Sequence, residues 1–305
     1  MNKEVLNLLS GKGGIDTKFQ VINPAATIDG NASHIWTVDD QDGQRRVIKQ
    51  YPDWVHENDI EMIHQYMGQL LQNGFPLAEL VGKPVWFDGN FYAVYAYADG
   101  MGYDPLNPAH LADMAQKLRM LHDLSQSIKI DGQRNWPTVS GFVYAGSVEL
   151  LSNAWNVASE LMINTNRHTV PIHGDFRKIN IRFNENGINR VFDFGNARND
   201  YPEVDLAITL RDIGEGSVEP DSFALQGRFL RIFKDSGIEA PKILPDYIYA
   251  SSIVITIQES SYLFQRYSRN HENVTKLLLQ RETEYLTFLL ETKDRLLSLY
   301  GGIFT

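Results

Sequence analysis

Apolar and polar residues alternate over short runs in the first hundred positions, a pattern that is typical of β-strands. Residues 35–38 and 46–49 form one pair of such runs, and residues 81–86 and 91–97 form a second pair. An Asp-Gly dipeptide lies between the two runs of each pair, and this dipeptide favours the tight turn of a hairpin. We therefore expect two β-hairpins in this part of the chain.

A helical pattern separates the two hairpins. Its apolar side chains recur three or four positions apart and would form one face of a helix, namely Ile60, Ile63, Met67, Leu70 and Leu71. An Asn-Gly dipeptide at residues 73–74 follows as a stop signal. One helix is thus expected within the β-rich part of the chain.

Helical patterns dominate after residue 100. Asn107 followed by Pro108 is typical of a helix start, with an N-cap residue and proline at the first helical position. Further helical patterns occupy residues 223–234, 246–266 and about 274–300. The sequence predicts an α+β protein with a small β-rich lobe, a larger helical lobe and a ligand bound between them.

Composition limits the classes of function. The chain has 305 residues, enough for two lobes, and its formal net charge of −10 argues against a nucleic-acid partner. That charge fits a cationic substrate, although self-repulsion that maintains solubility explains it equally well. The absence of cysteine excludes disulfide bonds, cysteine-ligated zinc and thiol catalysis.

Neither a signal peptide nor a membrane span is expected. The N-terminal residues contain no uninterrupted apolar segment, and the longest weakly polar run, residues 247–257, is short and interrupted by serines. We expect a cytoplasmic protein without a membrane partner. A monomer and a homodimer are both compatible with the sequence.

The residues with the clearest chemical signal lie in the second half of the chain. His173-Gly174-Asp175 is followed by Asn180, and a strand at residues 188–192 ends at Asp193. A hairpin between them would present Asp175, Asn180 and Asp193 at one end. Phosphoryl transfer needs such groups, because a carboxylate must orient the acceptor hydroxyl and hard oxygen ligands must hold Mg²⁺.

This pattern, H-x-D-x-x-x-x-N followed by D-F-G, resembles the aminoglycoside phosphotransferase and choline kinase family. The resemblance extends from about residue 28 to at least Leu206. It implies a two-lobed, protein-kinase-like fold, with a nucleotide-binding lobe at residues 1–97 and a catalytic and acceptor-binding lobe at residues 98–305. Carried over, Asp175 is the catalytic base, and Asn180 and Asp193 bind Mg²⁺.

The resemblance also implies a nucleotide site in the first lobe. Lys49 matches the lysine that binds the α- and β-phosphates. Two further segments match the family's nucleotide loop and its adenine-binding hinge, and their implied contact residues are Gly30, Asn31 and Ser33 in the loop and Ala96, Tyr97 and Ala98 in the hinge. The implied cofactors are ATP, with GTP as an alternative, and Mg²⁺.

The sequence departs from the family pattern at the helix that should supply a glutamate to Lys49. The expected position is near Ile63 or His64, and neither is acidic. Glu61 is therefore the candidate partner of Lys49, with Glu57 one turn away as the alternative. A missing or replaced ion pair is the third interpretation.

Together these features predict an ATP- and Mg²⁺-dependent phosphotransferase that acts on a hydroxyl of a small molecule. Candidate acceptors are an aminoglycoside-like antibiotic, choline, homoserine or a sugar-type alcohol. A protein acceptor is disfavoured, because only eleven residues separate Asp193 from Asp205 and leave no room for an activation segment. An ATP-binding, pseudokinase-like module with little catalysis and an atypical protein kinase are the alternatives.

Two acidic features allow more than one interpretation. Asp205 could anchor the catalytic loop or cap a helix. The acid-rich stretch between Asp200 and Asp221 could face a cationic acceptor or form a solvated surface.

Overall fold

The computed structural model of this protein describes residues 3–11, 20–23, 34–51, 55–104, 107–130, 148–162, 169–214, 220–237, 242–270 and 273–304. They fall into two units. The first comprises Met1–Tyr103, Ile130–Gly132 and Ile181–Gly195, and the second comprises Asp104–Lys129, Gln133–Asn180 and Asn196–Thr305. The functional division at residue 97 stays a prediction.

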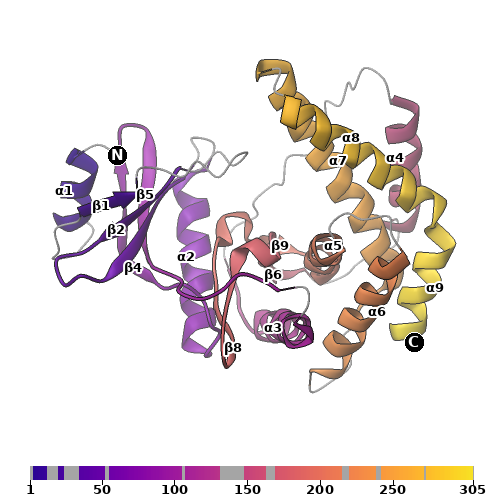
Figure 1. Ribbon diagram of the computed structural model, residues 1–305, viewed down its shortest axis with the longest axis horizontal. Helices are drawn as coiled ribbons and strands as arrows, with labels where there is room; N and C mark the ends of the chain where they lie inside the picture. Colours follow the sequence, from indigo (N-terminus) through magenta and orange to yellow (C-terminus); the bar gives the residue numbers. More distant parts are fainter. Residues whose placement is uncertain are drawn as a thin grey trace. The chain divides into compact units, whose positions relative to one another are not determined.

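A five-stranded antiparallel sheet forms the centre of the first unit, with strand order β1-β2-β3-β5-β4 (Figure 1). Its strands are β1 (Gln20–Asn23), β2 (His34–Asp39), β3 (Arg45–Gln50), β4 (Leu80–Phe87) and β5 (Asn90–Ala96). Both predicted hairpins are confirmed, because β2 pairs with β3 and β4 pairs with β5. Strand β1 was not predicted from the sequence.

Two helices pack on the two faces of this sheet. Helix α1 (Lys3–Gly11) places Val5 and Leu9 in a buried cluster with Ile48 of β3. Helix α2 (Glu57–Gln72) places Ile60 in a second cluster with Tyr51, which directly follows β3. Side chains alternate between the faces of a strand, so Lys49 shares the α2 face with Tyr51.

A third hairpin belongs to the first unit although it comes much later in the chain. Strands β7 (Ile181–Asn184) and β8 (Gly187–Val191) pair with each other. Phe183 and Met101 exchange two backbone hydrogen bonds of 2.8 and 2.9 Å. Gly100 has a φ of 128°, and a Cβ there would collide with the Phe183 carbonyl, so this close approach requires glycine.

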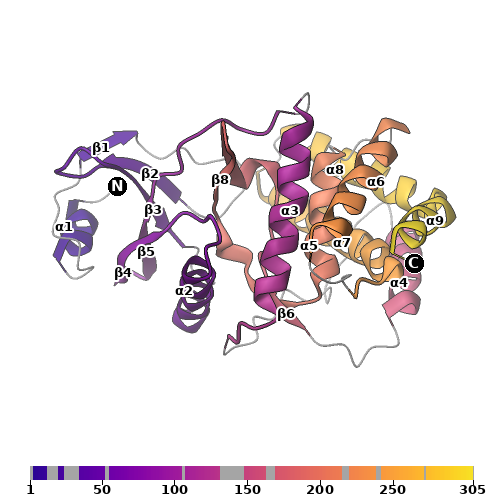
Figure 2. The same cartoon turned by 90° about the horizontal axis from the view of Figure 1, so that it is seen from below.

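The second unit is mainly helical, as the sequence predicts, and the α+β organisation is confirmed. Its helices are α3 (Pro108–Ser125), α4 (Val148–Met162), α5 (Pro202–Ile213), α6 (Pro220–Asp235), α7 (Pro245–Asn270), α8 (Asn273–Glu291) and α9 (Lys293–Phe304). Helix α5 packs against α7, and α3 packs against α6 (Figure 2). A short antiparallel pair, β6 (Val170–Ile172) with β9 (Arg198–Asp200), precedes α5.

Helix boundaries follow local signals where these are strong. The predicted start of α3 is confirmed, since Oδ1 of Asn107 accepts the Ala109 N–H at 3.0 Å and Pro108 occupies the first helical position. The single helix predicted at about 274–300 is wrong. The chain forms α8 and α9 instead, separated at Thr292, whose hydroxyl donates to the Phe288 carbonyl at 2.6 Å. Over the residues that the structure describes, no helix has both the length and the apolarity needed to cross a bilayer.

Candidate active site

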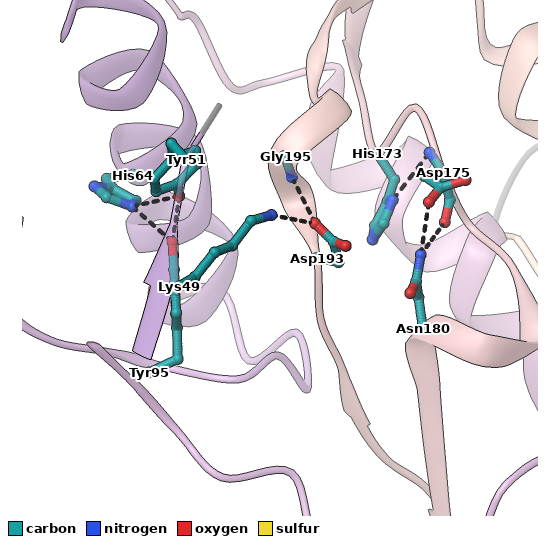
Figure 3. A network of polar contacts seen from close by, with 9 residues as sticks. All are labelled: Lys49, Tyr51, His64, Tyr95, His173, Asp175, Asn180, Asp193 and Gly195. Carbon is teal, nitrogen blue, oxygen red and sulfur yellow. Dashed lines mark hydrogen bonds and ion pairs between the residues drawn. The ribbon is translucent and has the colours of Figure 1, made fainter. Parts of the chain in front are cut away.

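Lys49 and Asp193 form an ion pair within the first unit, although 144 positions separate them in the sequence. The Lys49 ammonium donates to Oδ1 of Asp193 at 2.5 Å (Figure 3). Lys49 is only 8 % exposed on β3, and Asp193 lies just after β8. The pair brings together two of the predicted site residues.

The backbone at Asp193 has an unusual conformation. Its φ is 63°, in the left-handed region that non-glycine residues rarely adopt. A Cβ at Gly195 would lie 2.8 Å from the Lys49 ammonium, so glycine allows the lysine to approach this turn closely. Strained conformations of this kind cluster at functional sites.

Uncharged side chains surround the other side of Lys49. Its ammonium lies 5.1 Å from the centroid of the Tyr51 ring. The Tyr51 hydroxyl contacts the Tyr95 hydroxyl, and Nε2 of His64 lies 3.2 Å from the Tyr51 hydroxyl and 2.8 Å from the Tyr95 hydroxyl. Burial and the charge of Lys49 lower the pKa of His64 to about 4, so this imidazole is neutral at physiological pH.

The expected pairing of Glu61 with Lys49 is not formed. Glu61 is exposed on α2, and within the described part of the chain it makes no hydrogen bond or ion pair with Lys49. Glu57 is exposed as well. His64 follows Ile60 by four positions and therefore shares its sheet-facing side, whereas Glu61 points elsewhere. The interpretation of a replaced ion pair agrees with this geometry.

The predicted catalytic loop, residues 173–180, lies in the second unit and holds Asp175 in a nearly buried position, 6 % exposed. Nδ2 of Asn180 donates to Oδ2 of Asp175 at 2.8 Å and to its backbone carbonyl at 3.0 Å. Arg177 forms an ion pair with Oδ1 of Asp175. Burial opposes the charge on Arg177, but Asp175, Glu259 and Asp212 raise the pKa of its guanidinium, which stays charged.

Asp205 anchors this loop from α5. Its fully buried carboxylate accepts the backbone N–H of His173 at 2.9 Å and that of Gly174 at 2.7 Å, and contacts Nε2 of His122 at 3.3 Å. Burial alone would raise the pKa of Asp205, but the contacts with His122 and His173 lower it overall. Of the two interpretations of Asp205, the anchor is confirmed, because Tyr201 is the N-cap of α5.

Two more residues of α5 hold the same loop. The Thr209 hydroxyl donates to the Phe176 carbonyl at 2.8 Å, and Oδ2 of Asp212 accepts the Lys178 N–H at 2.6 Å. Because positions 205, 209 and 212 are four and three residues apart, they share one face of α5. One helix face therefore fixes the loop at three points.

Gly174 is required for the loop conformation. Its φ is 75°, and a Cβ there would collide with the Asn196 carbonyl. The neighbouring His173 is fully buried, and its Nδ1 accepts the Asp175 N–H at 3.1 Å. The His-Gly-Asp sequence thus combines a buried acceptor, a left-handed glycine and a positioned carboxylate.

The predicted metal ligands have suitable chemistry. Asn180 uses its Nδ2 on Asp175, which leaves its amide oxygen as the atom that can bind a cation. Asp193 already attracts a cation, the Lys49 ammonium. In the described segments no three His, Asp or Glu side chains form a metal cluster, but Mg²⁺ needs only one or two protein ligands when phosphates and water complete its shell. Taken singly, the amide oxygen of Asn180 and the carboxylate of Asp193 are each ligands of the kind that Mg²⁺ prefers.

The structure gives little information on the predicted residues of the nucleotide loop and the hinge. Gly30, Asn31 and Ser33 lie outside the described residues. Ala96 ends β5, and its N–H donates to the Glu79 carbonyl at 2.8 Å. Tyr97 and Ala98 follow in an irregular segment, where the Arg45 guanidinium lies 5.4 Å from the Tyr97 ring centroid.

Three acids of the acid-rich stretch, Asp200, Glu203 and Asp212, lie within the described residues, whereas Glu215 and Glu219 lie outside them. Glu203 is fully buried and accepts the Leu244 N–H at 2.8 Å, and Asp200 pairs with Arg198 at 2.9 Å. Asp212 accepts the Lys178 N–H of the predicted catalytic loop. These residues have structural partners, which the sequence pattern alone could not reveal.

Three residues of the site were not predicted. Arg177 lies inside the recognised motif, so its position was visible although its pairing with Asp175 was not. Tyr51 follows Lys49 by two positions, the spacing that places both on one face of a strand. His64 lies within the apolar stripe of α2, and a polar residue in such a stripe is a signal that could have identified it.

Comparison with known proteins gives the following similarities. Residues 25–227 match the family model described as "Phosphotransferase enzyme family". A search of curated proteins found no match. An amicoumacin kinase structure with AMP-PNP and Ca²⁺ has 14 % identity and a TM-score of 0.71, covering 94 % of this chain and 96 % of that one.

Two other solved structures are similar over comparable lengths. A microcompartment-associated aminopropanol kinase has 14 % identity and a TM-score of 0.68, with 94 % of each chain covered. A spectinomycin phosphotransferase has 13 % identity and a TM-score of 0.61, with 99 % of this chain and 98 % of that chain covered. At these identities the similarity concerns the fold, and the expected kinase-like fold is confirmed.

Proposed function

Because the chain belongs to the phosphotransferase enzyme family, as its motifs indicated, we propose that it transfers the γ-phosphate of ATP to a hydroxyl of a small molecule with the help of Mg²⁺. The observation that carries this proposal is the nearly buried Asp175 carboxylate, which Asn180 and Arg177 hold in a loop anchored by Asp205. A carboxylate fixed in this way can accept a proton from a bound hydroxyl.

In the proposed reaction, Asp175 orients the acceptor hydroxyl and takes its proton as the hydroxyl oxygen attacks the γ-phosphorus. A new O–P bond forms, the bond from the γ-phosphorus to the β–γ bridging oxygen breaks, and ADP leaves with that oxygen. Asn180 and Arg177 keep the Asp175 carboxylate in place during this step. Positioning and charge stabilisation supply most of the catalysis in phosphoryl transfer.

Nucleotide binding is assigned to Lys49 together with the loop and hinge residues of the first lobe. Lys49 would exchange its contact with Asp193 for the α- and β-phosphates, which frees Asp193 to bind the metal ion. Mg²⁺, when bound by Asn180 and Asp193, neutralises phosphate charge. The amicoumacin kinase complex with AMP-PNP and Ca²⁺ supports a nucleotide and a divalent cation in this fold.

The proposed acceptor is a small alcohol, and one that carries an amine is the first candidate. The printed name of the aminopropanol kinase and the net charge of −10 support this choice. Antibiotic sugars, choline, homoserine and sugar-type alcohols remain in the set to be tested. A cytoplasmic location agrees with ATP as the donor.

A panel experiment tests the proposal. Purified protein with ATP and Mg²⁺ is assayed for ADP release with amino alcohols, choline, homoserine, aminoglycosides and sugars, and products are identified by mass spectrometry. We expect acceptor-dependent ADP release that Asp175→Asn slows by about 10²–10⁴-fold. ATP binding without turnover on any acceptor would favour the module with little catalysis, and labelling of proteins in a lysate would favour an atypical protein kinase.

A further inference from the structure

One face of the first unit's sheet gathers Lys49 and two tyrosines. Lys49 lies opposite Ala93 in the pairing of β3 with β5, and Val47 lies opposite Tyr95. Directly paired residues point to the same side, and so do residues two apart on one strand. Lys49, Tyr51 and Tyr95 therefore project from the same face, which α2 covers.

His64 reaches this face from α2 and joins the two tyrosines. Its Nε2 lies 2.8 Å from the Tyr95 hydroxyl and 3.2 Å from the Tyr51 hydroxyl, and the two hydroxyls contact each other (Figure 3). The aromatic rings meet edge-on, with ring centroids 6.2 Å apart for Tyr51 and His64 and 6.1 Å apart for His64 and Tyr95. Three polar atoms from three elements thus form one closed group.

This group is uncharged at neutral pH. Burial, with the nearby charge of Lys49, lowers the pKa of His64, and burial, with Tyr51 and Asp193, raises the pKa of Tyr95 well above its ordinary value. Hydrogen bonds among neutral groups can fix side chains in a buried place without the desolvation cost of a charge.

The group acts on Lys49 through the Tyr51 ring. The ammonium lies 5.1 Å from the ring centroid, within the range of a cation–π contact. Since the Tyr51 hydroxyl is fixed by His64 and Tyr95, the ring cannot turn away, and its face stays beside the lysine. Tyr51 is only 2 % exposed, so there is little room for another orientation.

We propose that His64 is a positioning residue that, through Tyr51 and Tyr95, holds Lys49 for the phosphates of the nucleotide in place of a glutamate on α2. This inference rests on the proposed function, because it assumes that Lys49 binds phosphate. It explains how a helix with an exposed Glu61 can still order the lysine.

The test compares two substitutions and two ligands. His64→Phe keeps an aromatic ring but removes Nε2, and His64→Gln restores a polar group at about the same distance from the backbone. Dissociation constants are measured for AMP-PNP with Mg²⁺, which carries phosphates, and for adenosine, which has none. Gln65→Ala, an exposed neighbour on α2, is the matched control, and thermal unfolding of each variant is followed in parallel.

We expect His64→Phe to weaken AMP-PNP binding about tenfold, which is about 1.4 kcal/mol, and to change adenosine binding less than about twofold. His64→Gln should recover most of the loss. In a Lys49→Met background, His64→Phe should cause no further loss, because its effect passes through the lysine.

Three results would overturn the inference. These are equal weakening of AMP-PNP and adenosine by His64→Phe, additive losses in the Lys49→Met background, or coupling of Lys49 to Glu61 that exceeds its coupling to His64. If the wild-type protein binds AMP-PNP with Mg²⁺ no more tightly than adenosine, the phosphates do not contribute to affinity. The proposed function then fails, and this inference fails with it. Should His64→Phe not fold, Tyr51→Phe, which removes the hydroxyl that His64 contacts, takes its place in the comparison with Lys49→Met.

Discussion

The ammonium of Lys49 lies 2.5 Å from Oδ1 of Asp193, so the candidate phosphate ligand and a candidate metal ligand neutralise each other. Both side chains are partly buried, and an unpaired charge there would be costly. Nucleotide and metal ion together offer each residue a new partner, the phosphates for Lys49 and the cation for Asp193. Binding of the two ligands should therefore be cooperative.

We predict that Mg²⁺ and nucleotide strengthen each other's binding about 5- to 150-fold, the range of ordinary coupling energies. Calorimetric titration of AMP-PNP with and without Mg²⁺ measures this factor. The coupling should be weaker in Asp193→Ala, because this variant has no carboxylate that could exchange Lys49 for the metal ion as its partner. Equal coupling in Asp193→Ala and in the wild-type protein would contradict the exchange of partners.

Turnover should require the metal site itself. Asp193→Ala is expected to abolish phosphoryl transfer even at saturating ATP, because the phosphates then lack their positioned cation. Steady-state kinetics with the acceptor identified in the panel measure this loss. Undiminished activity of the wild-type protein in excess chelator would show that the assignment of Asn180 and Asp193 is incorrect.

The local signals of the sequence predicted local structure well. The two hairpins and the Asn107 cap depend on neighbouring residues, and all are present. Helices α1 and α4 were not predicted, although their apolar residues recur at helical spacing.

Relationships between distant segments could not be predicted in the same way. Asp205 could be assigned as an anchor only from the structure, which places the N–H groups of His173 and Gly174 beside α5, where they donate to the Asp205 carboxylate. The choice between Glu61 and His64 depends on how α2 is rotated against the sheet. That rotation is set by packing of Ile60 on Tyr51 and Ala93, which no short sequence pattern specifies.

Gly174, in the predicted catalytic loop, gives a stability prediction with a matched control. Gly174→Ala forces both a left-handed alanine and a collision with the Asn196 carbonyl, whereas Gly74→Ala, at a φ of 79°, meets open space. Backbone strain alone costs roughly 1–3 kcal/mol, so Gly74→Ala should stay within that range and Gly174→Ala should exceed it. Chemical denaturation measures both free energies of unfolding, and equal losses would contradict the close packing at Gly174.

Stability should fall as the pH drops from about 6.5 to about 4, in part because of His64. Its folded pKa is lowered to about 4 from an ordinary value of 6.5, so the unfolded chain binds more protons in this window. One such group contributes a slope of up to about 1.4 kcal/mol per pH unit, with stability rising with pH. Unfolding free energies measured across this range should show a shallower slope in His64→Phe. An unchanged slope would mean that His64 is not buried in its neutral form.

The most direct test of the account is kcat for Asp175→Asn, measured with the acceptor identified in the panel. The substitution keeps the size of the side chain but removes the proton acceptor. General-base catalysis is worth about 10²–10⁴-fold, so kcat should fall by that factor while the dissociation constant for AMP-PNP with Mg²⁺ changes little. A variant that retains more than about half of the wild-type kcat would contradict the assignment of Asp175 as the catalytic base.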